Sequence, residues 1–119
     1  MSKLLVVDDS TTDQNYLADI LGKAGHQVSR ARSGKEAIER ALSEKPDMIF
    51  MDVVMEDMDG YNATREILEQ DGNQDVAVVM VTSKNQKADK VWAQMQGAKG
   101  YIVKPYSEED VLEQLRSLL

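Results

Sequence analysis

Short apolar runs alternate with amphipathic stretches along the whole chain. The apolar runs lie at residues 4–8, 26–31, 47–52, 76–82 and 100–104, and their length and composition predict strands. Stretches with apolar residues at helical spacing follow them, at residues 10–25, 33–45, 61–70, 88–96 and 107–119. The pattern therefore predicts five βα units in succession, without a linker or repeat, within one domain spanning residues 1–119.

Polar residues at the ends of these stretches predict where the helices begin. Ser10 or Thr11 can cap the first helix and Gly25 can end it, while Ser33 with a glutamate three residues later has the spacing of a capping box. Ser107 precedes an acidic first turn and is expected to cap the last helix.

The apolar character of whole strands predicts an α/β fold. Strands without polar alternation are buried on both faces, which favours a parallel sheet with helices on each side. Right-handed crossovers then leave few topologies, and the doubly wound, flavodoxin-like order 2-1-3-4-5 is expected. In such a sheet a ligand site lies at the carboxyl ends of the strands, where strands 1 and 3 meet.

Polar side chains follow four of the predicted strands at this edge. They are Asp8 and Asp9 after the first strand, Asp52 after the third, Thr82 after the fourth and Lys104 after the fifth. Carboxylates that meet at one point repel each other and raise each other's pKa, unless a cation intervenes. Mg²⁺ takes oxygen ligands and commonly bridges protein carboxylates and phosphate oxygens, so the edge is expected to bind Mg²⁺ and a phosphoryl group.

Asp52 is the candidate nucleophile of this site. It ends the central strand and would face the two other aspartates, and a carboxylate can accept a phosphoryl group to give an aspartyl phosphate. Lys104 would supply a positive charge and Thr82 a hydroxyl, and phosphoryl transfer needs little more from a protein than such positioning and charge neutralisation.

Composition excludes several other classes of protein. The chain has 119 residues, no cysteine and a single histidine, His26, so it has neither a thiolate nor a multi-histidine metal site. With a net charge of −7 and no basic patch it is not expected to bind nucleic acid directly. No apolar run approaches the ~18 residues of a membrane span, and the N-terminus turns acidic too early for a signal peptide, so a cytoplasmic location is expected.

The acidic loop after the third strand also has a calcium interpretation. Asp57, Asp59, Gly60 and Glu66 fit four positions of an EF-hand loop, but Met55 at its first position has no oxygen ligand and a strand precedes the loop. The two aspartates are instead expected to form a turn in which Gly60 supplies a positive φ. A nucleotide-binding loop and a hydrolase with two acids spaced D-x-D are disfavoured because DDSTTD matches neither pattern.

The whole chain resembles the receiver domains of response regulators. The stretches that carry the resemblance are LLVVDDS, PDMIFMDVVMEDMDGY, VVMVTS and GAKGYIVKPYS. The resemblance implies that a histidine kinase transfers a phosphoryl group to Asp52 with the help of Mg²⁺. It further implies that Asp9 binds the metal directly together with Asp52, that Asp8 binds it through water, and that Val54 binds it through its backbone carbonyl.

The resemblance also implies roles for residues of the last two strands. Thr82 and Lys104 would bind phosphoryl oxygens, Tyr101 would be the aromatic switch that moves inward when Thr82 is drawn to the phosphate, and the Lys104–Pro105 bond would be cis. Two positions depart from the usual pattern. Glu56 stands where receivers usually have proline, which predicts a looser loop, and Val54 cannot orient an attacking water, which predicts slow dephosphorylation.

Within this family the chain is most similar to receivers of the Pil–Chp twitching-motility pathway, of the PilH kind. The stretches AGHQV, DVVM and SKNQKADKVWAQMQGAKGYIVKP carry this likeness. It implies a kinase with a CheA-like phosphotransfer domain and a part in the control of type IV pili.

The chain ends with the helix at 107–119, so we expect a stand-alone signalling protein without an output domain, rather than an enzyme. Phosphorylation would then change the face made by the fourth helix, fifth strand and fifth helix (88–96, 100–104 and 107–119), where an effector of unknown identity would bind. Lys84, Lys87 and Lys90 make that face basic and suggest an acidic partner. The alternative is a phosphate sink that drains the kinase, and the sequence does not distinguish the two.

Overall fold

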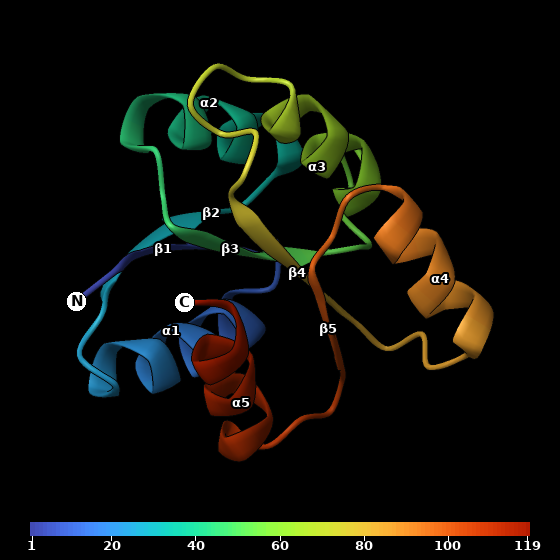
Figure 1. The fold of residues 1–119 in the computed structure, drawn as a ribbon. Coiled ribbons are helices and arrows are strands. Elements are labelled where there is room, and N and C mark those ends of the chain that lie inside the picture. The colour runs from blue at the N-terminus through green and yellow to red at the C-terminus, as the bar shows by residue number, and fades with distance from the viewer.

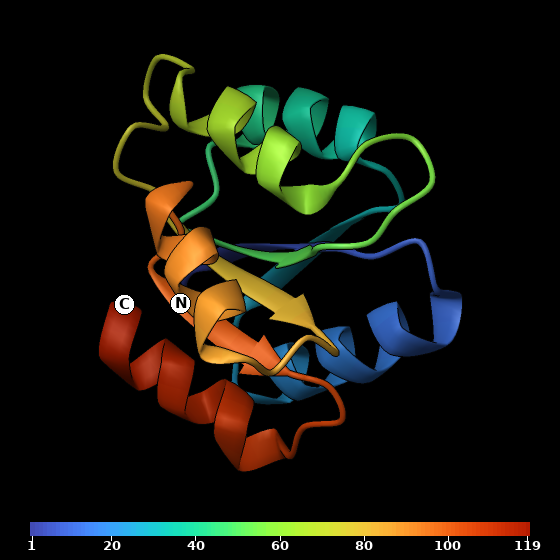
Figure 2. The same ribbon diagram turned by 90° about the vertical axis from the view of Figure 1, so that its right-hand side faces the viewer.

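The computed structural model describes residues 1–119 as a parallel five-stranded sheet in the order β2-β1-β3-β4-β5, with helices on both faces (Figure 1, Figure 2). The strands are β1 (Lys3–Val7), β2 (Gln27–Ala31), β3 (Met48–Asp52), β4 (Ala77–Thr82) and β5 (Gly100–Val103). The helices are α1 (Thr11–Lys23), α2 (Gly34–Glu44), α3 (Gly60–Leu68), α4 (Lys87–Met95) and α5 (Glu108–Leu118). The predicted fold class and strand order are confirmed, and the observed bounds differ from the predicted ones by one or two residues.

Two apolar layers sandwich the sheet. Leu5 and Val7 of β1 point into the layer under α2, α3 and α4, whereas Leu4 and Val6 point into the layer under α1 and α5. Figure 1 shows α2 and α3 together on one side of the strands and α1 and α5 on the other. The central strands read as continuous apolar runs because both of their faces are buried. No helix combines the length and the apolar character that a membrane crossing requires.

The helix starts follow the predicted caps with one difference. Ser10 and Ser107 cap α1 and α5 through their side chains, as expected. Ser33 accepts the Glu36 N–H, but the Glu36 carboxylate accepts the backbone N–H of Arg32 instead of that of Ser33. The capping box predicted for α2 is therefore only half formed. The Glu36 carboxylate instead holds the backbone of Arg32, the residue before the cap Ser33.

Gly60 was predicted to supply a positive φ, and this is wrong. Positive φ values occur at Gly25, Gly72, Gly97 and Lys45, whereas Gly60 is the first residue of α3. A Cβ atom at position 60 would lie 2.2 Å from the carbonyl oxygen of Asp52. Glycine is required there because the start of α3 packs directly against the backbone at the end of β3.

Asp57 and Asp59 fasten the loop between β3 and α3. The Asp57 carboxylate accepts the backbone N–H groups of Gly34 (3.0 Å) and Lys35 (2.9 Å) at the start of α2, and these bonds lower the pKa of Asp57. Asp59 caps α3 by accepting the Asn62 N–H at 2.8 Å. The loop between β3 and α3 is thus tied to the N-termini of α2 and α3, where carboxylates are stabilised by the helix dipole.

Gly60→Ala tests the close approach at the end of β3. We expect the substitution to lower the free energy of unfolding by about 2 kcal/mol, because the added methyl group overpacks against the Asp52 carbonyl. Urea denaturation measures the change. Gly22→Ala in α1 is the matched control: a Cβ there meets nothing within 4 Å, so this variant should be stabilised by up to about 1 kcal/mol. Equal effects of the two substitutions would contradict the packing role of Gly60.

Candidate functional site

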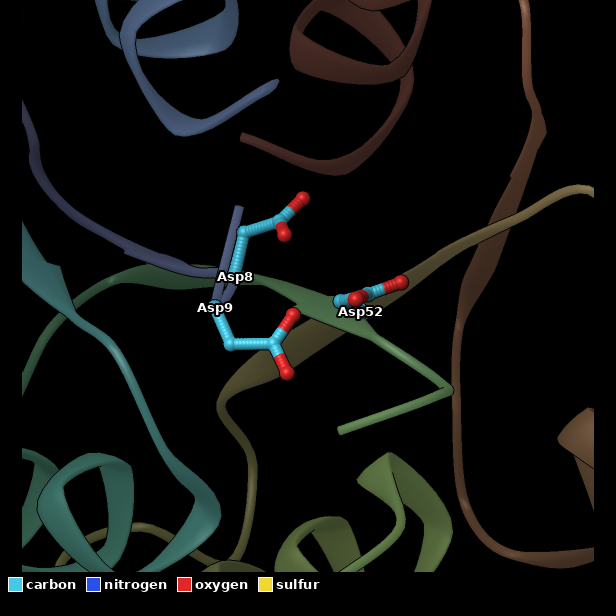
Figure 3. A group of neighbouring side chains, drawn as sticks. All are labelled: Asp8, Asp9 and Asp52. Carbon is cyan, nitrogen blue, oxygen red and sulfur yellow. The ribbon is translucent and has the colours of Figure 1, made fainter. Parts of the chain in front are cut away.

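Three carboxylates meet at the carboxyl edge of the sheet. Asp8 and Asp9 follow β1, Asp52 ends β3, and one carboxylate oxygen of each lies within 4.8 Å of the others. Figure 3 shows the three side chains together at the ends of these two strands. They are neighbours because β1 and β3 pair directly, with Val7 opposite Met51. The structure therefore brings together the acids that the sequence placed at one edge.

Asp8 is held in place by hydrogen bonds from several elements. Its backbone N–H donates to the Ala31 carbonyl (3.1 Å), and its carboxylate accepts the Ser10 N–H (2.9 Å). The buried Gln14 amide donates to the carbonyls of both Asp8 (3.3 Å) and Ala31 (2.9 Å). Sequence reasoning missed Gln14, although a polar residue three positions before Leu17, on the apolar face of α1, was a detectable signal.

The environment of Asp52 disfavours its negative charge. Burial raises the pKa of Asp52 to about 6, the nearby charges of Asp8 and Asp9 add to the rise, and Lys104 opposes it. The three carboxylates of this cluster are thus opposed by one positive charge, that of Lys104. A hard divalent cation with oxygen ligands would relieve the repulsion, so the donor set fits Mg²⁺.

Lys104 reaches into the acidic cluster from the end of β5. Its Nζ lies 3.0 Å from an Asp13 oxygen, 3.1 Å from an Asp8 oxygen and 3.6 Å from an Asp52 oxygen. Burial alone would lower the pKa of the lysine, but the hydrogen bond with Asp13 and the charges of Asp52 and Asp8 raise it overall. Sequence reasoning missed Asp13, because an acid in the first turn of a helix is already accounted for by the helix dipole.

Thr82 and Tyr101 meet at the backbone of Lys84. Thr82 is buried at the end of β4, and its Oγ1 accepts the Lys84 N–H at 3.3 Å. The half-buried Tyr101 donates its hydroxyl proton to the Lys84 carbonyl at 2.8 Å. Burial raises the pKa of Tyr101 to about 12, so this hydroxyl remains a donor at neutral pH. Lys84 therefore links Thr82 and Tyr101, the two side chains that were predicted to act together.

Two further predicted residues lie at the rim of the site. The Lys104–Pro105 peptide bond is cis, as expected. Val54, two residues after Asp52, is 65 % exposed. A valine side chain neither donates nor accepts a hydrogen bond, so this part of the rim presents an apolar surface to water.

Comparison with known proteins gives the family of the chain. Residues 4–116 match the response regulator receiver domain family. The chain is 40 % identical over 119 residues to protein PilH of Pseudomonas aeruginosa, with all of this chain and 98 % of that protein covered.

Solved structures agree with this match. Chemotaxis protein CheY4 of Vibrio cholerae superposes with a TM-score of 0.95 at 31 % identity, covering 100 % of this chain and 99 % of that one. The receiver domain of a sensor histidine kinase from Pseudomonas aeruginosa superposes with a TM-score of 0.91 at 26 % identity, covering 98 % and 96 %. A magnesium ion is coordinated in the active-site cleft of the latter.

The raised pKa of Asp52 predicts a pH-dependent effect of Asp52→Asn on stability in metal-free protein. The folded chain holds the Asp52 proton more tightly than the unfolded chain, where the pKa is near 3.8. The stability gained from the protonated form is therefore present below about pH 4 and lost as the pH rises through about 6. Asparagine never ionises, so the variant avoids this loss.

We expect Asp52→Asn to exceed the wild type in free energy of unfolding by about 1–2 kcal/mol at pH 7.5 and by much less at pH 4. Urea denaturation in the presence of EDTA at both pH values measures the difference. A difference that is the same at the two pH values would show that the Asp52 carboxyl titrates normally.

Proposed function

Because the chain belongs to the response regulator receiver family, we propose that it is a signalling protein whose surface is switched when Asp52 accepts a phosphoryl group from a histidine kinase. The observation that carries the proposal is the convergence of Asp52 with Asp8, Asp9, Lys104 and Thr82 at one edge of the sheet. The donor would be a phosphohistidine of a CheA-like phosphotransfer domain, and the protein would act as a phosphoacceptor, not as an enzyme on an external substrate.

The transfer would be a displacement at phosphorus by a carboxylate oxygen of Asp52. The bond from this oxygen to phosphorus forms as the bond from phosphorus to the donor imidazole nitrogen breaks, and the imidazole keeps the electron pair. A pKa of about 6 leaves Asp52 largely ionised at neutral pH and ready to attack. Asp8, Asp9, Asp52 and the Val54 carbonyl would hold Mg²⁺, which supplies positive charge to the phosphoryl oxygens when bound.

Lys104 and Thr82 would bind the oxygens of the transferred group. Movement of Thr82 toward the phosphoryl group would alter its hydrogen bond with the Lys84 N–H, and Tyr101 is bonded to the carbonyl of the same residue. The shared backbone of Lys84 supports coupling between the two side chains. Tyr101 would then leave Lys84 and move inward, which shifts the population of surface states on α4, β5 and α5.

The exposed surface of α4 supports an acidic partner with apolar residues. Lys84, Lys87 and Lys90 are exposed in a chain whose net charge is −7. Trp92 and Met95 of α4 are also exposed, by 48 % and 70 %. A surface with both positive charge and exposed apolar residues complements an acidic, amphipathic segment of an effector.

The likeness of the chain to PilH-kind receivers supports a cytoplasmic role in the control of twitching motility and type IV pili. The alternative, a phosphate sink, uses the same chemistry without an effector. Beryllofluoride with Mg²⁺ mimics the phosphorylated state, so a partner retained only in its presence would separate an effector binder from a sink.

Asp52→Ala tests the acceptor. With Mg²⁺ and radiolabelled acetyl phosphate, we expect the wild type to incorporate label and the variant to fall to background, because no other carboxylate ends β3. Gel autoradiography measures incorporation. EDTA should abolish the wild-type signal, and Asp71→Asn, a change of charge at an exposed residue in the loop after α3, should leave it unchanged. Labelling that persists in Asp52→Ala would remove Asp52 as the acceptor.

Val54→Asn tests the apolar rim beside the phosphoryl group. An asparagine amide can hydrogen-bond an attacking water, whereas valine cannot, so we expect the variant to lose its phosphoryl group at least about twofold faster. The measurement is the first-order loss of label from purified phosphoprotein with Mg²⁺. Val54→Leu, which is close to asparagine in size but makes no hydrogen bond, serves as the steric control and should not speed the loss. A smaller increase in Val54→Asn would show that Val54 does not limit hydrolysis.

A further inference from the structure

Asp13 is the acidic contact of Lys104 that phosphoryl chemistry does not explain. It lies in the first turn of α1 and takes no part in the cluster of Asp8, Asp9 and Asp52. Even so, its oxygen makes the shortest ionic contact of the lysine, 3.0 Å from Nζ, whereas the nearest Asp52 oxygen is 3.6 Å away. The lysine therefore rests nearer to α1 than to the phosphoryl acceptor.

Further contacts join α1 to the segment that carries Lys104. The Tyr16 hydroxyl donates to the Tyr106 carbonyl at 3.3 Å, and the two rings are 5.5 Å apart. A cleft of about 530 Å³ at this junction is lined by Asp13, Tyr16, Ser83, Lys104, Pro105 and Tyr106. The tyrosine contacts fix the start of the segment before α5, so the Lys104 side chain can change partners while its backbone stays in place.

The position of the Lys104 Nζ atom makes Asp13 and a phosphoryl group competitors. Asp8 and Asp13 accept two of the three ammonium hydrogens and hold Nζ 3.6 Å from the nearest Asp52 oxygen, so donation of the third hydrogen toward Asp52 requires the lysine to move. A phosphoryl oxygen attached to Asp52 would attract Lys104 toward β3 and lengthen its contact with Asp13. A cation in the acidic cluster would compensate Asp8 for a weaker contact with the lysine, but Asp13 lies outside that cluster.

The exposure of Asp13 keeps the cost of this exchange small. Its side chain is 47 % exposed, compared with 8 % for Asp8, so water can solvate the Asp13 carboxylate when the lysine leaves. A buried partner would bind Lys104 too strongly to release it, because an unpaired buried charge is costly. A half-exposed partner suits a contact that is made and broken in each signalling cycle.

We propose that Asp13 is a positioning residue that anchors Lys104 in the unphosphorylated protein and releases it when Asp52 carries a phosphoryl group. The inference rests on the function proposed above. Asp13 disfavours the phosphorylated state, and removing its charge makes Lys104 more available to the phosphoryl group.

A double-mutant cycle tests, without phosphoryl chemistry, whether Asp13 anchors Lys104. Asp13→Asn and Lys104→Met are made singly and together, and unfolding by urea is followed in EDTA. We expect Asp13→Asn to raise the unfolding equilibrium constant about threefold more in the presence of Lys104 than in the Lys104→Met background. A loss of helix-dipole stabilisation alone would be the same in both backgrounds, and equal effects would overturn the anchor.

The affinity of the protein for beryllofluoride tests whether Asp13 releases Lys104 when a phosphoryl group is present. Calorimetric titration in the presence of Mg²⁺ should show about threefold tighter binding by Asp13→Asn than by the wild type, because the competing carboxylate is gone. Asp13→Glu keeps the charge and should restore affinity close to that of the wild type. Asp19→Asn makes the same change of charge at an exposed position of α1 and should have no effect.

The two measurements separate the outcomes. Equal affinities of Asp13→Asn and the wild type, or equal tightening by Asp19→Asn, would overturn the release of Lys104 while leaving the proposed function intact. A wild type that binds no beryllofluoride would overturn both the phosphoryl function and the release, and the double-mutant cycle would still decide whether Asp13 anchors the lysine.

Discussion

Mutual repulsion among Asp8, Asp9 and Asp52 is the constraint around which the rest of the structure is arranged. These acids cannot move apart, because the apolar strands that carry them are buried on both faces and pair directly with each other. The burial of β1 and β3 thus holds like charges within a few ångströms, at the expense of a raised pKa at Asp52. A site with this stored repulsion attracts positive charge, whether a divalent cation or the Lys104 ammonium.

Residues around the site hold its backbone in place and so limit which groups can move in response to that repulsion. Gln14 fixes the backbone after β1, Gly60 lets α3 begin against the carbonyl of Asp52, and Asp57 ties the loop after β3 to α2. The backbone near Asp52 is therefore held on several sides. The groups left to rearrange are side chains, namely Lys104, Thr82 and Tyr101, and each has a partner in this structure that it can give up.

The sequence predicted the parts of the molecule that depend on periodicity and on chain order. Strands that are apolar throughout implied a parallel sheet, and parallel strands necessarily deliver Asp8, Asp9, Asp52, Thr82 and Lys104 to one edge. The sequence did not predict the roles of residues that depend on how close two elements lie in space. The D-x-D-G pattern around Gly60 resembles a turn locally, and only the packing of α3 on β3 shows that the missing Cβ is what matters. Asp13 was missed for the same reason, since nothing near it in the sequence indicates Lys104.

The hydroxyl of Tyr101 has a consequence for how the protein would respond to acidity. With a pKa of about 12 it stays protonated throughout the physiological range, so its bond to the Lys84 carbonyl can be broken by movement but not by titration. Asp52, with a pKa of about 6 in the metal-free protein, does titrate within that range. In the metal-free protein, acidity therefore changes the charge at the carboxyl edge of the sheet, while the hydrogen bond between Tyr101 and the Lys84 carbonyl stays intact.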